Sequence, residues 1–253
     1  MKKLIFGSIA VLGIGLSGSS GATPIKWQTE TGSSSTSFSC GSGFGNTCTF
    51  NSGGEILKAR GYSTANDSGT GDFEKAMLSV YNGGIGVRNR DDSNETSSPN
   101  HSVDNYGRDD FVVFEYEAAN YSPTGFKIGW EENDSDIRAW IGGGSLAAGY
   151  DFTGKEVSDL GSLGFTRFTF NNVAVDALKL FNTALTGRYL ILAPQLYNMN
   201  GVADRNYDYF KISEIRGTDS TPPTQVPEPG TAALLAIALA GLWANRRWKG
   251  AKR

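Results

Sequence analysis

Oxygen-bearing side chains are densest between residues 81 and 117, in "YNGGIGVRNRDDSNETSSPNHSVDNYGRDDFVVFEYE". Ca²⁺ takes about six to eight oxygen ligands from flexible acidic loops and backbone carbonyls, so this stretch contains a candidate calcium site made of Asp104, Asn105, Asp109 and Asp110. The alternative is turn chemistry, in which Asp and Asn bond to nearby backbone and tolerate unusual φ angles. We favour the turn interpretation and keep calcium as the candidate cofactor.

A second acidic loop, "EENDSD", spans residues 131 to 136. In an extended segment Asp134 and Asp136 lie on the same side, which adds them to the candidate calcium ligands. The loop lacks the glycine and the distal glutamate of an EF-hand. A solvated hairpin tip is therefore the favoured interpretation.

Two tryptophans, Trp130 and Trp140, flank this acidic loop. Exposed tryptophans would offer flat platforms for the apolar faces of sugar rings. A tryptophan at the end of a strand more often closes the core, where it buries a large area. Carbohydrate contact at Trp130 and Trp140 requires both rings to be exposed on one concave face.

No constellation in the sequence indicates catalysis. His101 lies three and four residues before Asp104 and Asn105, yet no G-x-S-x-G motif occurs and nothing ties a serine to His101. Paired carboxylates for glycoside hydrolysis lie far apart in sequence and cannot be recognised there. The run "GGIGVRN" lacks the following lysine and helix of a phosphate-binding loop, so its glycines favour tight strand packing. We expect no enzyme; the alternative, a polysaccharide-cleaving enzyme, would require His101 or two carboxylates in a cleft.

The segments that must position these residues have the sequence pattern of β-strands. Runs of β-branched and aromatic residues recur between Gly, Asn and Asp turn signals, at 55–64, 75–81, 85–89, 111–117, 125–130, 136–142, 165–170, 188–196 and 207–215, with an irregular or edge strand around 38–50. Only "VAVDALKLFN" (173–182) has a helical pattern. This series predicts an all-β fold, a single antiparallel β-sandwich that is jelly-roll-like, over residues 23–217.

Within "FVVFEYE" the apolar and polar positions alternate. A period of two places Val112, Phe114 and Tyr116 on one face of the strand and the remaining residues, Phe111, Val113, Glu115 and Glu117, on the other. The pattern predicts a half-buried antiparallel strand.

The N-terminus reads as a secretory signal peptide over residues 1–22. Two lysines precede an apolar run, and Ser20 and Ala22 stand at the positions of a cleavage site. Export through the Sec machinery brings the chain into oxidising conditions. Cys40 and Cys48 are then expected to form a disulfide, because no further soft metal ligand lies near them.

Removal of the two terminal segments during export also changes the formal net charge of the protein. Residues 1–22 and 230–253 carry seven of the 23 Lys and Arg residues and no acid, so the exported part keeps 16 positive residues against 26 Asp and Glu, a formal charge of −10. Nucleic acid and anionic lipid demand clustered positive charge, so we expect neither as a partner.

The C-terminus has three consecutive parts. A short motif, Pro227, Glu228 and Pro229, is followed by an apolar stretch (231–248) and a basic tail (246–253). The most apolar part, 231–244, would reach only ~21 Å as a helix, short of the ~30 Å hydrocarbon core, so it spans a membrane only with Trp248 and snorkelling arginines included. The prolines of the preceding linker (218–226) keep the segment before the helix extended.

The order of these three parts resembles the PEP-CTERM sorting signal of Gram-negative bacteria that make exopolysaccharide. That resemblance implies recognition by exosortase, a membrane-embedded protease or transpeptidase, transient anchoring in the inner membrane, and cleavage near the motif. The elements "GGIGV", "HSVDN", "IGWEENDSDIRAWIGG" and "DYFKISEIRG" further resemble exosortase-dependent surface proteins over residues 80–217. This family implies an exported β domain without an assigned reaction.

Together these features predict a surface or extracellular-matrix protein with a structural or adhesive role, as in a biofilm. The alternative is a calcium-assisted carbohydrate-binding module for exopolysaccharide. Exposure of Trp130, Trp140 and the 131–136 loop on one face would favour that alternative.

Overall fold

The computed structural model describes residues 24–66, 70–90, 95–118, 120–183, 185–196 and 206–219. All of them belong to one compact unit, Ala22–Thr221. Their regular structure is β throughout, apart from a single 3₁₀ turn, η1 (Val157–Asp159). The predicted signal peptide (1–22) and sorting signal (227–253) lie outside the described residues.

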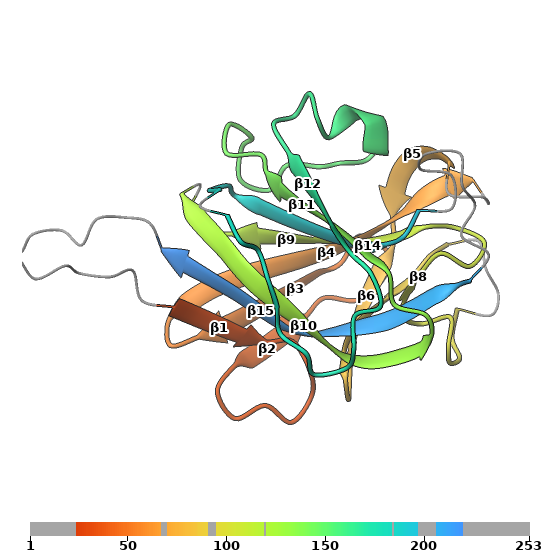
Figure 1. The fold of residues 1–253 in the computed structure, drawn as a ribbon, viewed down its shortest axis with the longest axis horizontal. Coiled ribbons are helices and arrows are strands. Elements are labelled where there is room, and N and C mark those ends of the chain that lie inside the picture. Colours follow the sequence, from red (N-terminus) through yellow and green to blue (C-terminus); the bar gives the residue numbers. More distant parts are fainter. Residues whose placement is uncertain are drawn as a thin grey trace, which may run out of the picture. The chain divides into compact units, whose positions relative to one another are not determined.

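The first sheet is organised around one long strand. Its order is β13-β10-β15-β7-β6, and β1 and β8 also pair with β15, all of them antiparallel. β10 pairs along one edge of β15, and β1, β7 and β8 share the other edge (Figure 1). The strands are β1 (Pro24–Gln28), β6 (Met77–Tyr81), β7 (Gly84–Arg88), β8 (Val103–Asp104), β10 (Tyr121–Asn133), β13 (Lys179–Leu180) and β15 (Asp208–Asp219).

The second sheet is also antiparallel and has the order β12-β11-β14-β9-β4-β3-β2, with β5 paired to β4. The predicted Cys40–Cys48 disulfide is confirmed and links β2 to β3, where the two cysteines face each other in register. The strands are β2 (Ser37–Cys40), β3 (Thr47–Ser52), β4 (Glu55–Asn66), β5 (Thr70–Lys75), β9 (Asp110–Tyr116), β11 (Ile137–Gly142), β12 (Thr166–Phe170) and β14 (Tyr189–Pro194).

The main core lies between the two sheets. Trp27 and Ile212 of the first sheet belong to the same buried cluster as Phe114 and Leu190 of the second. All four side chains are fully buried. The predicted all-β fold of packed antiparallel sheets is confirmed, although β15 continues to Asp219, two residues past the expected end of the domain.

A second buried cluster covers the outer face of the second sheet. The segment between β11 and β12 (143–165, here the excursion) folds back over that sheet and contributes Phe152, which packs with Tyr62, Tyr189 and Trp140. Figure 1 shows the excursion in green beyond β11 and β12. Because of it every residue of β9 is buried, so the prediction of a half-buried strand was wrong.

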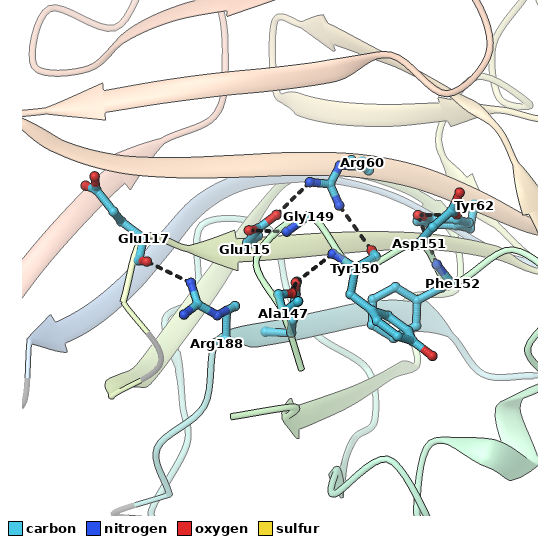
Figure 2. Close-up of polar contacts among 11 residues, drawn as sticks. Arg60, Tyr62, Glu115, Glu117, Ala147, Gly149, Tyr150, Asp151, Phe152 and Arg188 are labelled. Carbon is cyan, nitrogen blue, oxygen red and sulfur yellow. Dashed lines mark hydrogen bonds and ion pairs between the residues drawn. The ribbon is translucent and has the colours of Figure 1, made fainter. Parts of the chain in front are cut away.

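Polar contacts fasten the excursion to the sheet (Figure 2). The Arg60 guanidinium pairs with the Glu115 carboxylate at 2.6 Å and donates to the Tyr150 carbonyl at 3.3 Å. The Gly149 N–H donates to the second Glu115 oxygen at 2.8 Å, and the Tyr189 hydroxyl donates to the Ala147 carbonyl at 2.6 Å. The outward-facing charges of β4 and β9 therefore hold the excursion in place.

The helix predicted at 173–182 does not form. Asn172 and Asp176 adopt φ angles of 49° and 60°, in the left-handed region that ends helices. The Ser135 hydroxyl donates to the Val173 carbonyl at 2.8 Å, and the segment ends in the two-residue strand β13, paired with β10. Contacts with the sheet override the local helical pattern.

We predict that Phe152→Ala lowers the free energy of unfolding by about 3–5 kcal/mol, because the ring is fully buried and its removal leaves a cavity under the excursion. Urea denaturation followed by tryptophan fluorescence measures the change. The control is Phe44→Ala, whose ring is 45% exposed and should change stability little. Equal effects of the two substitutions would show that the excursion is not a packed layer.

Candidate functional site

Buried carboxylates gather at one end of the sandwich. Asp104 ends β8, Asp110 and Asp208 begin β9 and β15, and Asp136 directly precedes β11. The register places Tyr209 beside Asp104 and Asn133 beside Asp208, which brings these strand ends together. We call this region, where β8 lies in Figure 1, the acidic end; its buried acids are Glu95, Asp104, Asp109, Asp110, Asp136 and Asp208.

Asp208 is hydrogen-bonded to three other segments of the chain. Its carboxylate accepts hydrogen bonds from the backbone N–H groups of Asp136 at 2.7 Å and Gln195 at 3.0 Å, and from the Asn105 amide at 3.2 Å. The Asp208 N–H donates in return to the Asn105 side-chain oxygen at 2.9 Å. One carboxylate thus joins β15 to the chain after β8, the chain before β11 and the chain after β14.

Burial dominates the acid–base behaviour of two of these groups. It raises the pKa of Asp208 to about 8, although the two backbone N–H donors act in the opposite direction. Burial also raises the pKa of Asp110 well above its usual range, and the nearby charges of Asp104, Glu95 and Asp109 add to that increase. Such shifts concentrate at functional sites, but they also arise in structural networks.

The structure divides five of the six predicted calcium ligands into two groups, and the sixth, Asp134, lines a separate cavity. Asp104, Asp109 and Asp110 are neighbours, whereas Asp136 and Asn105 belong to the Asp208 network. Asp104 accepts the Tyr106 N–H at 3.0 Å, which is the turn chemistry favoured by the sequence. In the described ranges, no three acidic, histidine or cysteine side chains converge as they would around a bound metal ion.

Residues 131–135 line a cavity of about 310 Å³ together with Asn172 and Ala174. Residues 131–133 are exposed, as expected for a solvated tip. Asp136 is buried instead, and its carboxylate accepts a hydrogen bond from the Asn172 N–H at 2.7 Å. The prediction of a solvated loop was therefore wrong for Asp136. Asp134 accepts the Ser135 N–H at 2.7 Å.

The predicted pair of tryptophan platforms is not formed. Trp140 is only 3% exposed and packs under the excursion on the second sheet. Trp130 is half-buried on β10 of the first sheet, and the Lys211 ammonium lies 4.4 Å from its ring centroid. Trp140 is buried and the Trp130 ring is covered by the Lys211 ammonium. The expected sugar-binding face shared by the two rings is therefore wrong.

His101 belongs to the same group as Lys211. The Lys211 ammonium lies 3.1 Å from His101 Nε2 and 4.8 Å from the ring centroid of Tyr81. Desolvation lowers the pKa of Lys211. These contacts pack the outer face of the first sheet, and in the part of the chain described no serine hydroxyl is hydrogen-bonded to His101.

Two exposed tyrosines at the acidic end were missed by the sequence reasoning. Tyr106 and Tyr207 are 39% and 40% exposed, and their rings meet edge to face at a centroid distance of 5.0 Å. Tyr207 also contacts Tyr209 at 6.4 Å. In the sequence Tyr106 directly follows Asn105 and Tyr207 directly precedes Asp208. This adjacency is the signal that would have placed both tyrosines at the acidic end.

Comparisons with known proteins identify the C-terminus. The PEP-CTERM protein-sorting motif matches residues 225–247, a range that includes the predicted motif residues Pro227, Glu228 and Pro229. The chain carries a PEP-CTERM sorting domain. The motif implies exosortase processing, export and membrane-anchored transit before release at the surface. No curated protein and no solved structure matches the chain.

The matched segment lies outside the residues that the structure describes. Among those that it does describe, no helix is both long and apolar enough to cross a membrane. The predicted sorting helix (231–248) and basic tail (246–253) likewise fall outside the described ranges.

We predict that Asp208→Ala lowers the free energy of unfolding by about 3 kcal/mol or more, because it leaves three N–H donors without their acceptor at a buried position. Thermal unfolding and urea denaturation measure the effect. The control is Asp72→Ala at an exposed position of β5. A loss no larger than that of the control would show that Asp208 does not hold the strand ends together.

Proposed function

We propose that the mature domain is a non-catalytic structural or adhesive component of the cell surface or extracellular matrix of a bacterium that makes exopolysaccharide. In this proposal the Sec machinery exports the chain and exosortase processes it. The observation that carries the proposal is the course of β15, which leads from the acidic end to the C-terminal sorting segment.

The two ends of β15 have different surroundings. At its C-terminal end Thr218 pairs with Pro24 of β1, so the described chain begins and ends at the same end of the sandwich. Asp208 begins the strand at the acidic end. The 12 residues of β15 span roughly 40 Å. A domain held through its C-terminus therefore presents the acidic end away from the attachment.

This geometry suits a domain that bears load. A force between the acidic end and the sorting segment acts along β15, whose two edges are hydrogen-bonded to β10 and to β1, β7 and β8. Such a force shears several ladders at the same time. A load-bearing role needs no reacting group. The partners of two buried carboxylates support this role, because Glu115 is paired with Arg60 and Asp208 accepts hydrogen bonds from backbone N–H groups.

A strain that lacks the gene, complemented with wild type or with Pro227, Glu228 and Pro229 replaced by alanine, tests this role. We expect the substituted protein to stay in the membrane fraction and the cells to lose as much polysaccharide under shear as the deletion strain. Pro222→Ala with Pro223→Ala is the matched control, because these prolines precede the matched range. Unchanged polysaccharide retention in the deletion strain would contradict a structural or adhesive role.

A specific observation favours a second candidate function, contact with exopolysaccharide. The Tyr106 and Tyr207 rings are the exposed aromatic pair at the acidic end, beside the 131–135 cavity. Glu132 of that cavity lies near enough to raise the pKa of Tyr209, which contacts Tyr207. Aromatic faces with hydrogen-bonding groups beside them suit the alternating apolar and hydroxyl surfaces of a neutral sugar polymer.

We predict that Tyr106→Ala with Tyr207→Ala weakens binding of the mature surface protein to purified exopolysaccharide about tenfold, the combined effect of two aromatic contacts. Co-sedimentation measures binding, with Phe44→Ala as the control at an exposed ring on the loop between β2 and β3. Equal binding by wild type and the double variant would reject this surface. Shortening of the polymer in these samples would contradict the absence of catalysis.

A further inference from the structure

Asp110 occupies an unusual place for a charged residue. It is the first residue of β9, in which Val112, Phe114 and Tyr116 face the main core. Alternation along the strand points the Asp110 side chain to the same face, into the space between the sheets at the acidic end. The residue is fully buried.

Neither carboxylate oxygen of Asp110 has a hydrogen-bond partner within the described part of the chain. The Asp104 N–H faces this carboxylate and favours its charged form, without reaching hydrogen-bond geometry. The charges of Asp104, Glu95 and Asp109, which add to the rise in the Asp110 pKa, are all negative. The nearby Arg108 guanidinium is directed to the Thr64 carbonyl and the Glu74 carboxylate.

An isolated buried carboxylate without a partner is costly, and like charges around it increase that cost. Native proteins meet this cost by pairing the charge or by coordinating a metal ion. No Lys or Arg in the described ranges forms an ion pair with Asp110. A cation from solution would pair with the Asp110 carboxylate, as no Lys or Arg of the described residues does.

We propose that Asp110 and Asp104 bind one Ca²⁺ ion between the two sheets at the acidic end, with Glu95 and Asp109 adding negative charge around it. Hydrogen bonds from the Tyr106 N–H and the Ser102 hydroxyl to the two Asp104 oxygens hold that carboxylate in place. Backbone carbonyls and water complete the coordination of Ca²⁺, so two carboxylates suffice without the convergence of a third.

The donor chemistry selects calcium over other divalent ions. All candidate donors are oxygens, whereas the only histidine contacts Lys211 and both cysteines form the disulfide. Zinc prefers nitrogen and sulfur ligands. Mg²⁺ demands near-ideal octahedral geometry and gives up its water reluctantly, whereas Ca²⁺ accepts carboxylates and backbone carbonyls in a flexible geometry.

Calcium titration of the full-length protein in mild detergent tests this site. The melting temperature should rise by about 5–10 °C in a hundredfold excess of Ca²⁺ over its Kd, relative to chelator, and Mg²⁺ should produce a much smaller shift. Terbium gives a second readout that does not depend on stability, since Tyr209 beside Asp104 should sensitise its luminescence. Ca²⁺ should displace the terbium.

Two substitutions localise the effect. Asp110→Asn should abolish the calcium shift and raise the melting temperature in chelator, because a neutral amide removes the buried charge. Asp134→Asn, at a half-buried position that lines the 131–135 cavity, should keep the wild-type calcium response. If Asp110→Asn does not fold, Asp104→Asn replaces it and should weaken terbium binding at least tenfold.

Several outcomes would overturn the proposal. They are no shift of the melting temperature with millimolar Ca²⁺, an equal shift in wild type and Asp110→Asn, and loss of the response in Asp134→Asn alone. The calcium site does not rest on the proposed surface role, because binding is measured on the isolated protein and the role on polysaccharide retention by cells.

Discussion

The complete pairing of β15 is the constraint on which the rest of the structure depends. A strand of 12 residues carries donors and acceptors on both edges, and each must be satisfied where it is buried. β10 pairs with one edge from Asp208 to Asp219, with three register shifts, while β1, β7 and β8 divide the other. Segments from the beginning, middle and end of the domain therefore meet on one strand, which closes the sandwich.

The two ends of β15 then differ in chemistry. At the C-terminal end the pairing with β1 brings the start and end of the described chain together. At the other end the strand starts with Asp208, whose carboxylate joins three other segments. The hydrogen bonds to this one carboxylate position the neighbouring Tyr106 and Tyr207 without any regular structure in the connecting loops.

Local sequence patterns predicted the strands well and their surroundings poorly. Alternation in "FVVFEYE" placed Val112, Phe114 and Tyr116 correctly toward the core, and the sorting motif was recognisable because its three parts are contiguous. The same alternation could not reveal that residues 143–165 fold over the other face and bury Trp140. The helical pattern at 173–182 failed because the left-handed turn at Asp176 and pairing with β10 are set by tertiary contacts. Asp208 was missed because its partners lie far away in sequence.

Hydrogen–deuterium exchange of the full-length protein, resolved to single strands by mass spectrometry, tests the central role of β15 most directly. We expect the amides of β15 to exchange only through global unfolding, together with those of β1 and β10, and the excursion to exchange earlier through local opening. Exchange of β15 as fast as that of the excursion would contradict the account. The sandwich would then be held together by its hydrophobic core alone.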